Sequence, residues 1–193
     1  PLSPAETDKH FRADLERWAE DHLPAAPLTG LPDVDLIRPT DIQSDIVATL
    51  LYPVTSWPFR HLYELARSWR TERRNEVIDL ALRSRTRRDE LMRGFRSAPF
   101  AYDMVMDIGA YRDLHRHRRC QQYRKPYGTG LGYATPQAIE DAGLTELYDS
   151  LMRQTFGTIG ELPEPGAQYL LPFAARGRFL FKGLSHGTYR LHV

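Results

Sequence analysis

Residues 100–107 of this chain read FAYDMVMD, and their large side chains alternate with smaller or acidic ones. Phe100, Tyr102, Met104 and Met106 occupy every second position, which is the period of two typical of a β-strand. Such alternation also implies that one face of the strand is buried. The residues before this stretch show helical patterns instead, so the strand marks a change in the organisation of the chain.

The N-terminal part, residues 1–98, is predicted to be mainly helical. Ser3, Pro4 and Glu6 form a helix-start signature, and the helix is expected to run to about residue 22. Residues 23–39 contain four prolines and no hydrophobic period, which predicts an irregular connector. Further helices are expected from the cap Thr40 to residue 51, from residue 58 to 66, and around residues 77–81.

The second part, residues 99–193, combines helices with strands. We expect a helix over residues 110–119, a loop over 126–132, a short helix between Pro136 and Gly143, and a longer helix over 145–156. Residues 177–182 alternate weakly and fit either a strand or a helix end. The sequence therefore predicts an α/β (α+β) fold, with a helix-rich N-terminal half and a small sheet in one compact domain.

Composition narrows the class of protein. The chain has 193 residues, 41% of them hydrophobic, and a formal net charge of +1 that conceals 23 Arg and 3 Lys. No stretch approaches the roughly 18 consecutive apolar residues of a membrane helix, and the N-terminus lacks a signal-peptide pattern, so we expect a cytoplasmic protein. The single cysteine, Cys120, cannot form an internal disulfide.

Positive charge is densest in residues 111–125, which contain a single acid, Asp113. A solvated helix face is one interpretation, and an anion site that follows the strand is the other. Metal binding by His115, His117 and Cys120 is not expected, because the two histidines diverge on a helix and the arginines repel a cation. Nucleic-acid binding through phosphate neutralisation is also not favoured, because the net charge is only +1.

Three short matches in the second part carry a family resemblance. The first is FAYDM at 100–104 together with RDLHRHR at 112–118, the second is AQYLLP at 167–172, and the third is SHGTYRL at 185–191. In this order the segments resemble the flavin-dependent thymidylate synthase (ThyX) family, whose motifs are R-H-R-x7-S, A-R-x-x-L-P and S-H-A-Q-x-E-I.

The resemblance implies a ThyX-like fold in a homotetramer, with FAD bound across subunit interfaces. The implied reaction methylates dUMP, or a related pyrimidine nucleotide, with methylenetetrahydrofolate and NADPH as co-substrates. Arg116, His117 and Arg118 fall on the family's FAD-contacting positions, and the implied role of their guanidinium groups is to stabilise negative charge on the flavin.

The nucleotide pocket is predicted to be altered. Pro126 and Gly128 stand where the family has serine and arginine, and Gln168 stands where it has arginine. Substrate contacts are therefore expected from other polar residues, namely Arg119, Gln121, Arg124, Lys125 and Arg178. Two alternatives remain open: a catalytically inactive flavin- or nucleotide-binding or assembly module, and nucleic-acid binding through the arginine-rich segments 83–96 and 112–125.

Overall fold

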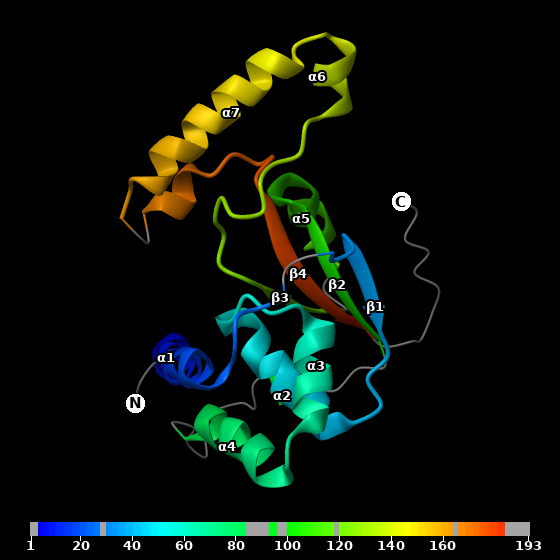
Figure 1. Ribbon diagram of the computed structural model, residues 1–193, viewed down its shortest axis with the longest axis vertical. Helices are drawn as coiled ribbons and strands as arrows, with labels where there is room; N and C mark the ends of the chain where they lie inside the picture. Colours follow the sequence, from blue (N-terminus) through cyan, green and yellow to red (C-terminus); the bar gives the residue numbers. More distant parts are fainter. Residues whose placement is uncertain are drawn as a thin grey trace.

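A computed structural model gives the fold and describes residues 4–27, 30–83, 93–95, 100–117, 120–163 and 166–183. Its elements lie in three regions: a layer of helices, a small sheet, and an arm of two helices that projects from the sheet (Figure 1). In chain order they are α1 (Pro4–His22), β1 (Val34–Ile37), α2 (Ile42–Leu51), η1 (Tyr52–Val54), α3 (Phe59–Ser68), α4 (Thr71–Leu82), η2 (Arg93–Phe95), β2 (Phe100–Asp107), α5 (Ile108–Leu114), β3 (Gln121–Arg124), α6 (Gln137–Asp141), α7 (Thr145–Gly160), η3 (Ala167–Leu170) and β4 (Arg176–Gly183).

The described strands form one antiparallel sheet in the order β1-β2-β4-β3. Strands β2 and β4 pair along their whole length, from Phe100 opposite Gly183 to Asp107 opposite Arg176. The α+β fold class predicted from the sequence is thereby confirmed, with a helix-rich first half and a small sheet.

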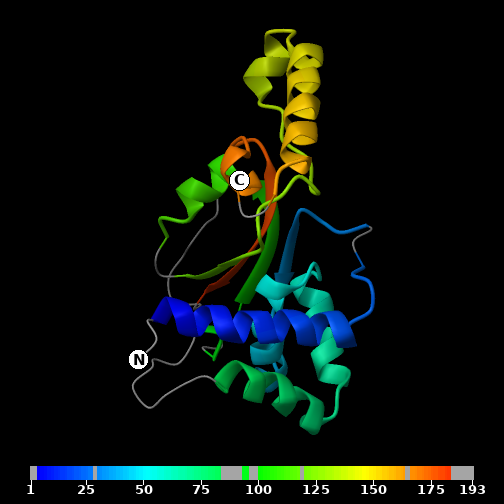
Figure 2. The same ribbon diagram turned by 90° about the vertical axis from the view of Figure 1, so that its left-hand side faces the viewer.

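The two faces of the sheet have different neighbours because side chains alternate along each strand. Ala101 and Leu180 belong to the main core, which packs against helices α1 to α4. Met104, Phe179 and Phe181 lie on the opposite face and pack with Tyr111 of α5. Figure 2 shows the four N-terminal helices at one end of the sheet and α5 nearer the other.

The helical layer follows from local sequence signals. Asp41 caps α2, since its carboxylate accepts a hydrogen bond of 2.8 Å from the backbone N–H of Ser44. In α3, the residues at positions i, i+3, i+4 and i+7, namely Phe59, Leu62, Tyr63 and Ala66, are all buried. Burying each of the three larger side chains stabilises the fold by about 1.5–3 kcal/mol.

A buried ion pair joins the helical layer to the sheet. The Lys182 ammonium of β4 donates to both carboxylate oxygens of Asp45 in α2, each at 2.6 Å, and to the Thr49 hydroxyl at 2.9 Å. Lys182 and Asp45 are fully or almost fully buried. Removing either partner alone would leave an uncompensated buried charge, so this pair holds the two layers in one register.

Several sequence predictions are confirmed. Helix α1 covers the expected residues to His22, β2 has the predicted bounds, and α6 lies within the predicted segment. Helix α7 begins at the predicted residue, Thr145, and runs one turn beyond the predicted end, to Gly160. Gly143, with φ of 69°, stands in the left-handed region just after α6, as expected of a helix-ending glycine. The proposed cap Ser3 lies outside the described residues.

Three predictions about local structure were wrong. The connector over residues 23–39 contains β1, and α2 is capped by Asp41 instead of Thr40. The helix expected over residues 110–119 begins at Ile108 and ends at Leu114. The chain then forms the unpredicted strand β3.

Candidate functional site

The R-H-R segment lies in the connection between α5 and β3. Asp107, the last residue of β2, caps α5, since its carboxylate accepts from the Ala110 N–H at 2.8 Å. The first residue after the helix is His115, whose N–H donates to the Tyr111 carbonyl at 2.7 Å. Strand β2 therefore leads directly into a short helix. Residues 115–117, which we call the basic turn, follow that helix.

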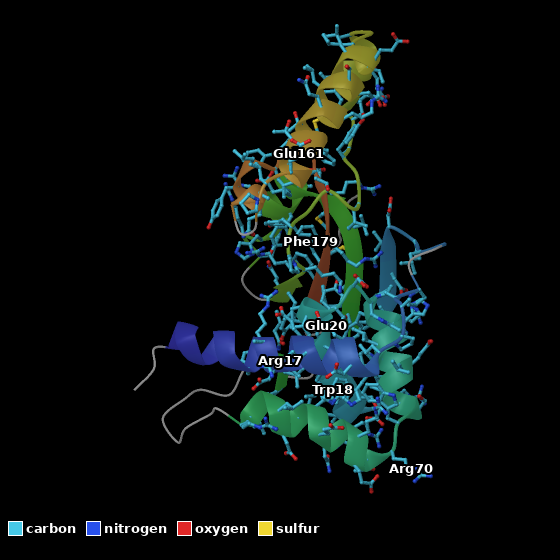
Figure 3. The ribbon with its side chains drawn as sticks, turned by 60° about the vertical axis from the view of Figure 1, so that its left-hand side comes forward. Arg17, Trp18, Glu20, Arg70, Glu161 and Phe179 are labelled. Atoms are coloured by element: carbon cyan, nitrogen blue, oxygen red, sulfur yellow. The ribbon has the colours of Figure 1, made fainter. Side chains whose placement is uncertain are left out.

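Aromatic packing fixes α5 on the sheet. The Tyr111 ring stacks on Phe179 of β4, with centroids 3.9 Å apart and planes 13° apart. Figure 3 shows Phe179 near the middle of the sheet. Burial raises the pKa of the Tyr111 hydroxyl, so this group stays protonated at neutral pH.

Gln122 of β3 holds the basic turn. Its amide oxygen lies 2.6 Å from His115 Nδ1, and its amide nitrogen donates to the carbonyl of His117 at 3.0 Å. Because the amide oxygen only accepts, the proton of this contact belongs to His115 Nδ1. One side chain thus fixes both the ring of His115 and the backbone of His117.

The predicted cofactor residues are partly described. Arg116 and His117 lie on the turn with exposed side chains, whereas Arg118 lies outside the described residues. Within the part of the chain that the structure describes, the Arg116 guanidinium takes part in no hydrogen bond or ion pair. It remains available to an anionic ligand.

Two predicted substrate residues lie on β3 with opposite orientations. Gln121 shares the sheet face of Lys182, its pairing partner, and its amide oxygen accepts from the Tyr123 hydroxyl at 3.0 Å. Arg124 lies on the face of Gln122, with its guanidinium carbon 4.6 Å from the centre of the Tyr127 ring. Arg119, a third predicted substrate residue, lies outside the described residues.

The other two predicted substrate residues, Lys125 and Arg178, point toward the helical layer. Arg178 is 6% exposed and donates to Asp103 at 3.1 Å. The Lys125 ammonium donates to the backbone carbonyls of Tyr52, at 2.8 Å, and Thr55. Burial lowers the pKa of Lys125 to about 7, an effect that Asp103 opposes and Arg178 reinforces.

Asp103 is a polar centre that the sequence analysis did not identify. Its carboxylate accepts from the Tyr52 hydroxyl and the Phe59 N–H, each at 2.7 Å, in addition to Arg178. The sequence did contain a signal for this buried carboxylate, because Asp103 occupies the same face of the strand as the small residue Ala101. A carboxylate on a buried strand face needs donors from another element.

The turn at residues 115–117 and the sheet face beside it offer groups that suit anions and planar rings. Arg116 offers a guanidinium group, and Arg124 with Tyr127 offers a cation stacked on an aromatic ring. Burial raises the pKa of the Cys120 thiol, which disfavours the nucleophilic thiolate. Among the described residues, no three His, Cys, Asp or Glu side chains are placed to hold a metal ion.

Comparisons with known proteins find UPF0159 proteins. A relative from Chlamydia muridarum is 35% identical over 141 residues, which is 70% of this chain and 26% of the relative. One from Chlamydia pneumoniae is 28% identical over 178 residues, covering 89% of this chain and 33% of the relative. A third, from Thermoplasma acidophilum, is 31% identical over 115 residues, covering 56% of this chain and 23% of the relative.

The chain spans between about a quarter and a third of the length of these curated relatives. No family model matches the sequence. No described helix is both long and apolar enough to cross a membrane. The name UPF0159 states no activity.

Proposed function

We propose that this chain is a ThyX-like flavoprotein whose basic turn binds FAD through Arg116, His117 and Arg118. The observation that carries the proposal is the turn itself: Gln122 fixes its backbone, while the Arg116 and His117 side chains stay exposed. Charge-assisted hydrogen bonds from a guanidinium group suit the pyrophosphate of FAD or the negative charge of its reduced ring. The ordered sequence motifs support the same assignment.

The residues around the turn fit such a cofactor in type. FAD combines anionic phosphates with planar rings, and the described face offers the exposed guanidinium of Arg124 beside the aromatic side chain of Tyr127. When bound, FAD would supply the hydride chemistry by which NADPH reduces a transferred methylene group. The task of this chain would be to position ring and phosphates, with Gln122 holding the backbone of His117 and the ring of His115 in place.

The substrate that we propose is dUMP or a related pyrimidine nucleotide, with methylenetetrahydrofolate as the carbon donor. Arg124 is the described residue best placed to meet its phosphate, because it is exposed on the sheet face that carries Gln122. Lys125 and Arg178 are engaged with the helical layer, so we assign them a supporting role beneath the site. We further propose that the protein acts in the cytoplasm as a homo-oligomer, as the family resemblance implies.

A flavin titration tests the cofactor assignment. Purified protein should show a flavin absorbance band or bind added FAD, and Arg116→Ala should weaken binding by about 10- to 100-fold, which corresponds to about 1.5–3 kcal/mol for one lost charge-assisted bond. Arg17→Ala is the matched control, since Arg17 is exposed on α1. Protein without a flavin band that also fails to bind added FAD would refute the proposal.

An inactive flavin- or nucleotide-binding module is the second candidate. Pro126 and Gly128 favour it, because neither side chain replaces the serine hydroxyl or the arginine fork that these positions hold in the ThyX family. An assay of dTMP formation from dUMP, methylenetetrahydrofolate and NADPH separates the two candidates. Sustained turnover excludes the inactive module, whereas flavin binding without turnover supports it.

A further inference from the structure

A second arginine–aromatic pair lies beside α5, formed by residues that the proposed function does not use. The Arg112 guanidinium carbon is 4.6 Å from the centre of the Phe173 ring, the same separation as in the Arg124–Tyr127 pair. Phe173 is 59% exposed, so it is largely open to solvent. An exposed aromatic ring with a guanidinium group over it is a surface on which another planar group can stack.

The backbone holds Phe173 against α5. The N–H of Gly109 donates to the Phe173 carbonyl at 3.0 Å, and the N–H of Ile108 donates to the Ala175 carbonyl at 3.0 Å. These two bonds continue the antiparallel pairing of β2 and β4 beyond the ends of both strands. Arg112 lies three residues after Gly109, on the same side of the helix. The sheet therefore fixes where the Phe173 backbone lies relative to Arg112.

Arg116 of the basic turn continues the row that Phe173 and Arg112 begin. His115 keeps helical backbone angles, with φ of −59° and ψ of −20°, and the N–H of Arg116 donates to the Asp113 carbonyl at 3.3 Å. The helical path thus extends to Arg116. Residues four apart on such a path are neighbours, separated by about 6 Å along the axis. Arg112 and Arg116 therefore carry two guanidinium groups about one turn apart.

Neither of these guanidinium groups is neutralised by a carboxylate in the part of the chain that the structure describes. The ion pairs found there include neither Arg112 nor Arg116, and Asp113, which lies between them, pairs with neither. Like charges one turn apart repel each other and destabilise a helix. An anion with two negative groups would relieve this repulsion by accepting charge-assisted hydrogen bonds from both arginines.

We propose that Phe173, Arg112 and Arg116 bind a nucleoside diphosphate group, with the base stacked at the Phe173 ring and the two phosphates held by the guanidinium groups. Such a group combines the one planar ring and the two adjacent anions that this row requires. The inference rests on the proposed function through Arg116, which is shared with the flavin site. The adenosine diphosphate halves of FAD and NADPH are the two sources of this chemistry.

A titration with a fluorescent ADP tests the subsite without any flavin. The probe is ADP with an N-methylanthraniloyl group on its ribose, and its fluorescence anisotropy with the full chain should show saturable binding that unlabelled ADP displaces. Phe173→Ala should weaken binding by about 10-fold, because base–aromatic stacking is lost. Arg112→Ala should weaken it by about 10-fold or more, because a charge-assisted hydrogen bond to phosphate is lost.

Two substitutions away from the row serve as matched controls. Leu147→Ala matches Phe173→Ala, since Leu147 is also 59% exposed but lies on α7. Arg67→Ala matches Arg112→Ala, since the Arg67 guanidinium carbon lies 5.8 Å from the centre of the Tyr63 ring on α3. Both controls should bind the probe as the wild-type chain does. Inorganic pyrophosphate is the comparator without a ring, and it should displace the probe at least about 10-fold less well than ADP.

The competitors FAD and NADPH identify the source of the group. Displacement of the probe by FAD alone assigns the subsite to the cofactor, and displacement by NADPH alone assigns it to the co-substrate. Absence of ADP binding would overturn the inference, as would binding that survives both Phe173→Ala and Arg112→Ala, or equal affinity for pyrophosphate and ADP.

This inference and the proposed function fail separately. FAD binding without ADP binding would leave the flavin assignment in place and overturn the subsite. ADP binding that depends on Phe173 and Arg112, in a chain that binds no FAD, would keep the subsite and refute the flavoprotein.

Discussion

The charge state of Lys125 gives the sharpest test of the buried polar groups between the sheet and the helical layer, which include Asp103 and Arg178. Its ammonium lies 4.1 Å from the centre of the Tyr52 ring and donates to two backbone carbonyls. The charged groups that act on it are Asp103 and Arg178. Burial, with a contribution from Asp103, raises the pKa of Tyr52 well above its ordinary value, so Tyr52 stays neutral in the pH range of interest. The perturbation that we propose is Lys125→Met.

The sign and size of the effect follow from proton linkage. The pKa of Lys125 is about 7 in the folded chain, against an ordinary value of 10.5. Between these values the unfolded chain holds a proton that the folded chain has released, so the free energy of unfolding rises with pH. The full effect is about 1.4 kcal/mol per pH unit, and between pH 7.5 and 9.5 it amounts to about 2.5 kcal/mol.

Urea unfolding at pH 7.5, 8.5 and 9.5 measures this difference. The wild-type chain should gain about 2.5 kcal/mol more stability over this range than Lys125→Met does. Arg17→Met serves as the control, since it removes one exposed positive charge from α1. Parallel pH profiles for the wild type and Lys125→Met would refute the argument that burial keeps this lysine neutral.

Three further substitutions test the packing around the site. Asp45→Ala should lower the free energy of unfolding by about 3–5 kcal/mol, because it leaves the buried Lys182 charge unpaired. Adding Lys182→Met should recover part of that loss, and urea titrations that show no recovery would contradict the proposed role of the ion pair. Gln122→Leu should weaken FAD binding and speed amide hydrogen exchange in the basic turn, because it removes the hydrogen bond to the His117 carbonyl. An unchanged exchange rate there would show that Gln122 does not hold the turn. Tyr111→Leu should lower the free energy of unfolding by about 0.5–1.5 kcal/mol more than its lost apolar area accounts for, because the stack on Phe179 is lost. Tyr111→Phe keeps the stack, so equal losses of stability for the two variants in thermal unfolding would contradict this reasoning.

Elements with a strong local pattern could be predicted from the sequence. Strand β2 alternates over eight residues, and its bounds were predicted at both ends. Helix α7 was predicted over residues 145–156, although its last turn was missed. Both elements carry their pattern within a single segment, so no knowledge of distant partners is needed.

The short strands could not be predicted in this way. Strand β1 has four residues in a proline-rich stretch, and β3 reads QQYR, which has no apolar alternation. Each forms only because a longer strand offers it an edge, β2 for β1 and β4 for β3. Pairing of this kind is a tertiary effect and outweighs local propensity.

The surroundings of the candidate site could be predicted only in part. Charge density pointed to residues 111–125 as a candidate, but the helix expected to extend to residue 119 ends at Leu114. Gln122 binds the carbonyls of the turn from a strand that the sequence did not reveal. The inward orientation of Lys125 and Arg178 depends on the register between β3 and β4, which no local pattern encodes.

The position of β4 has a consequence for how the chain folds during synthesis. Strand β4 lies between β2 and β3, yet it is the last described strand to leave the ribosome. Its Lys182 is 137 residues from Asp45, so α2 is complete long before its counter-charge exists. Contacts of such sequence separation slow folding, and until they form the nascent chain exposes an open strand edge and an apolar helix face. We therefore expect the sheet to close in one late step, after β4 has been synthesised.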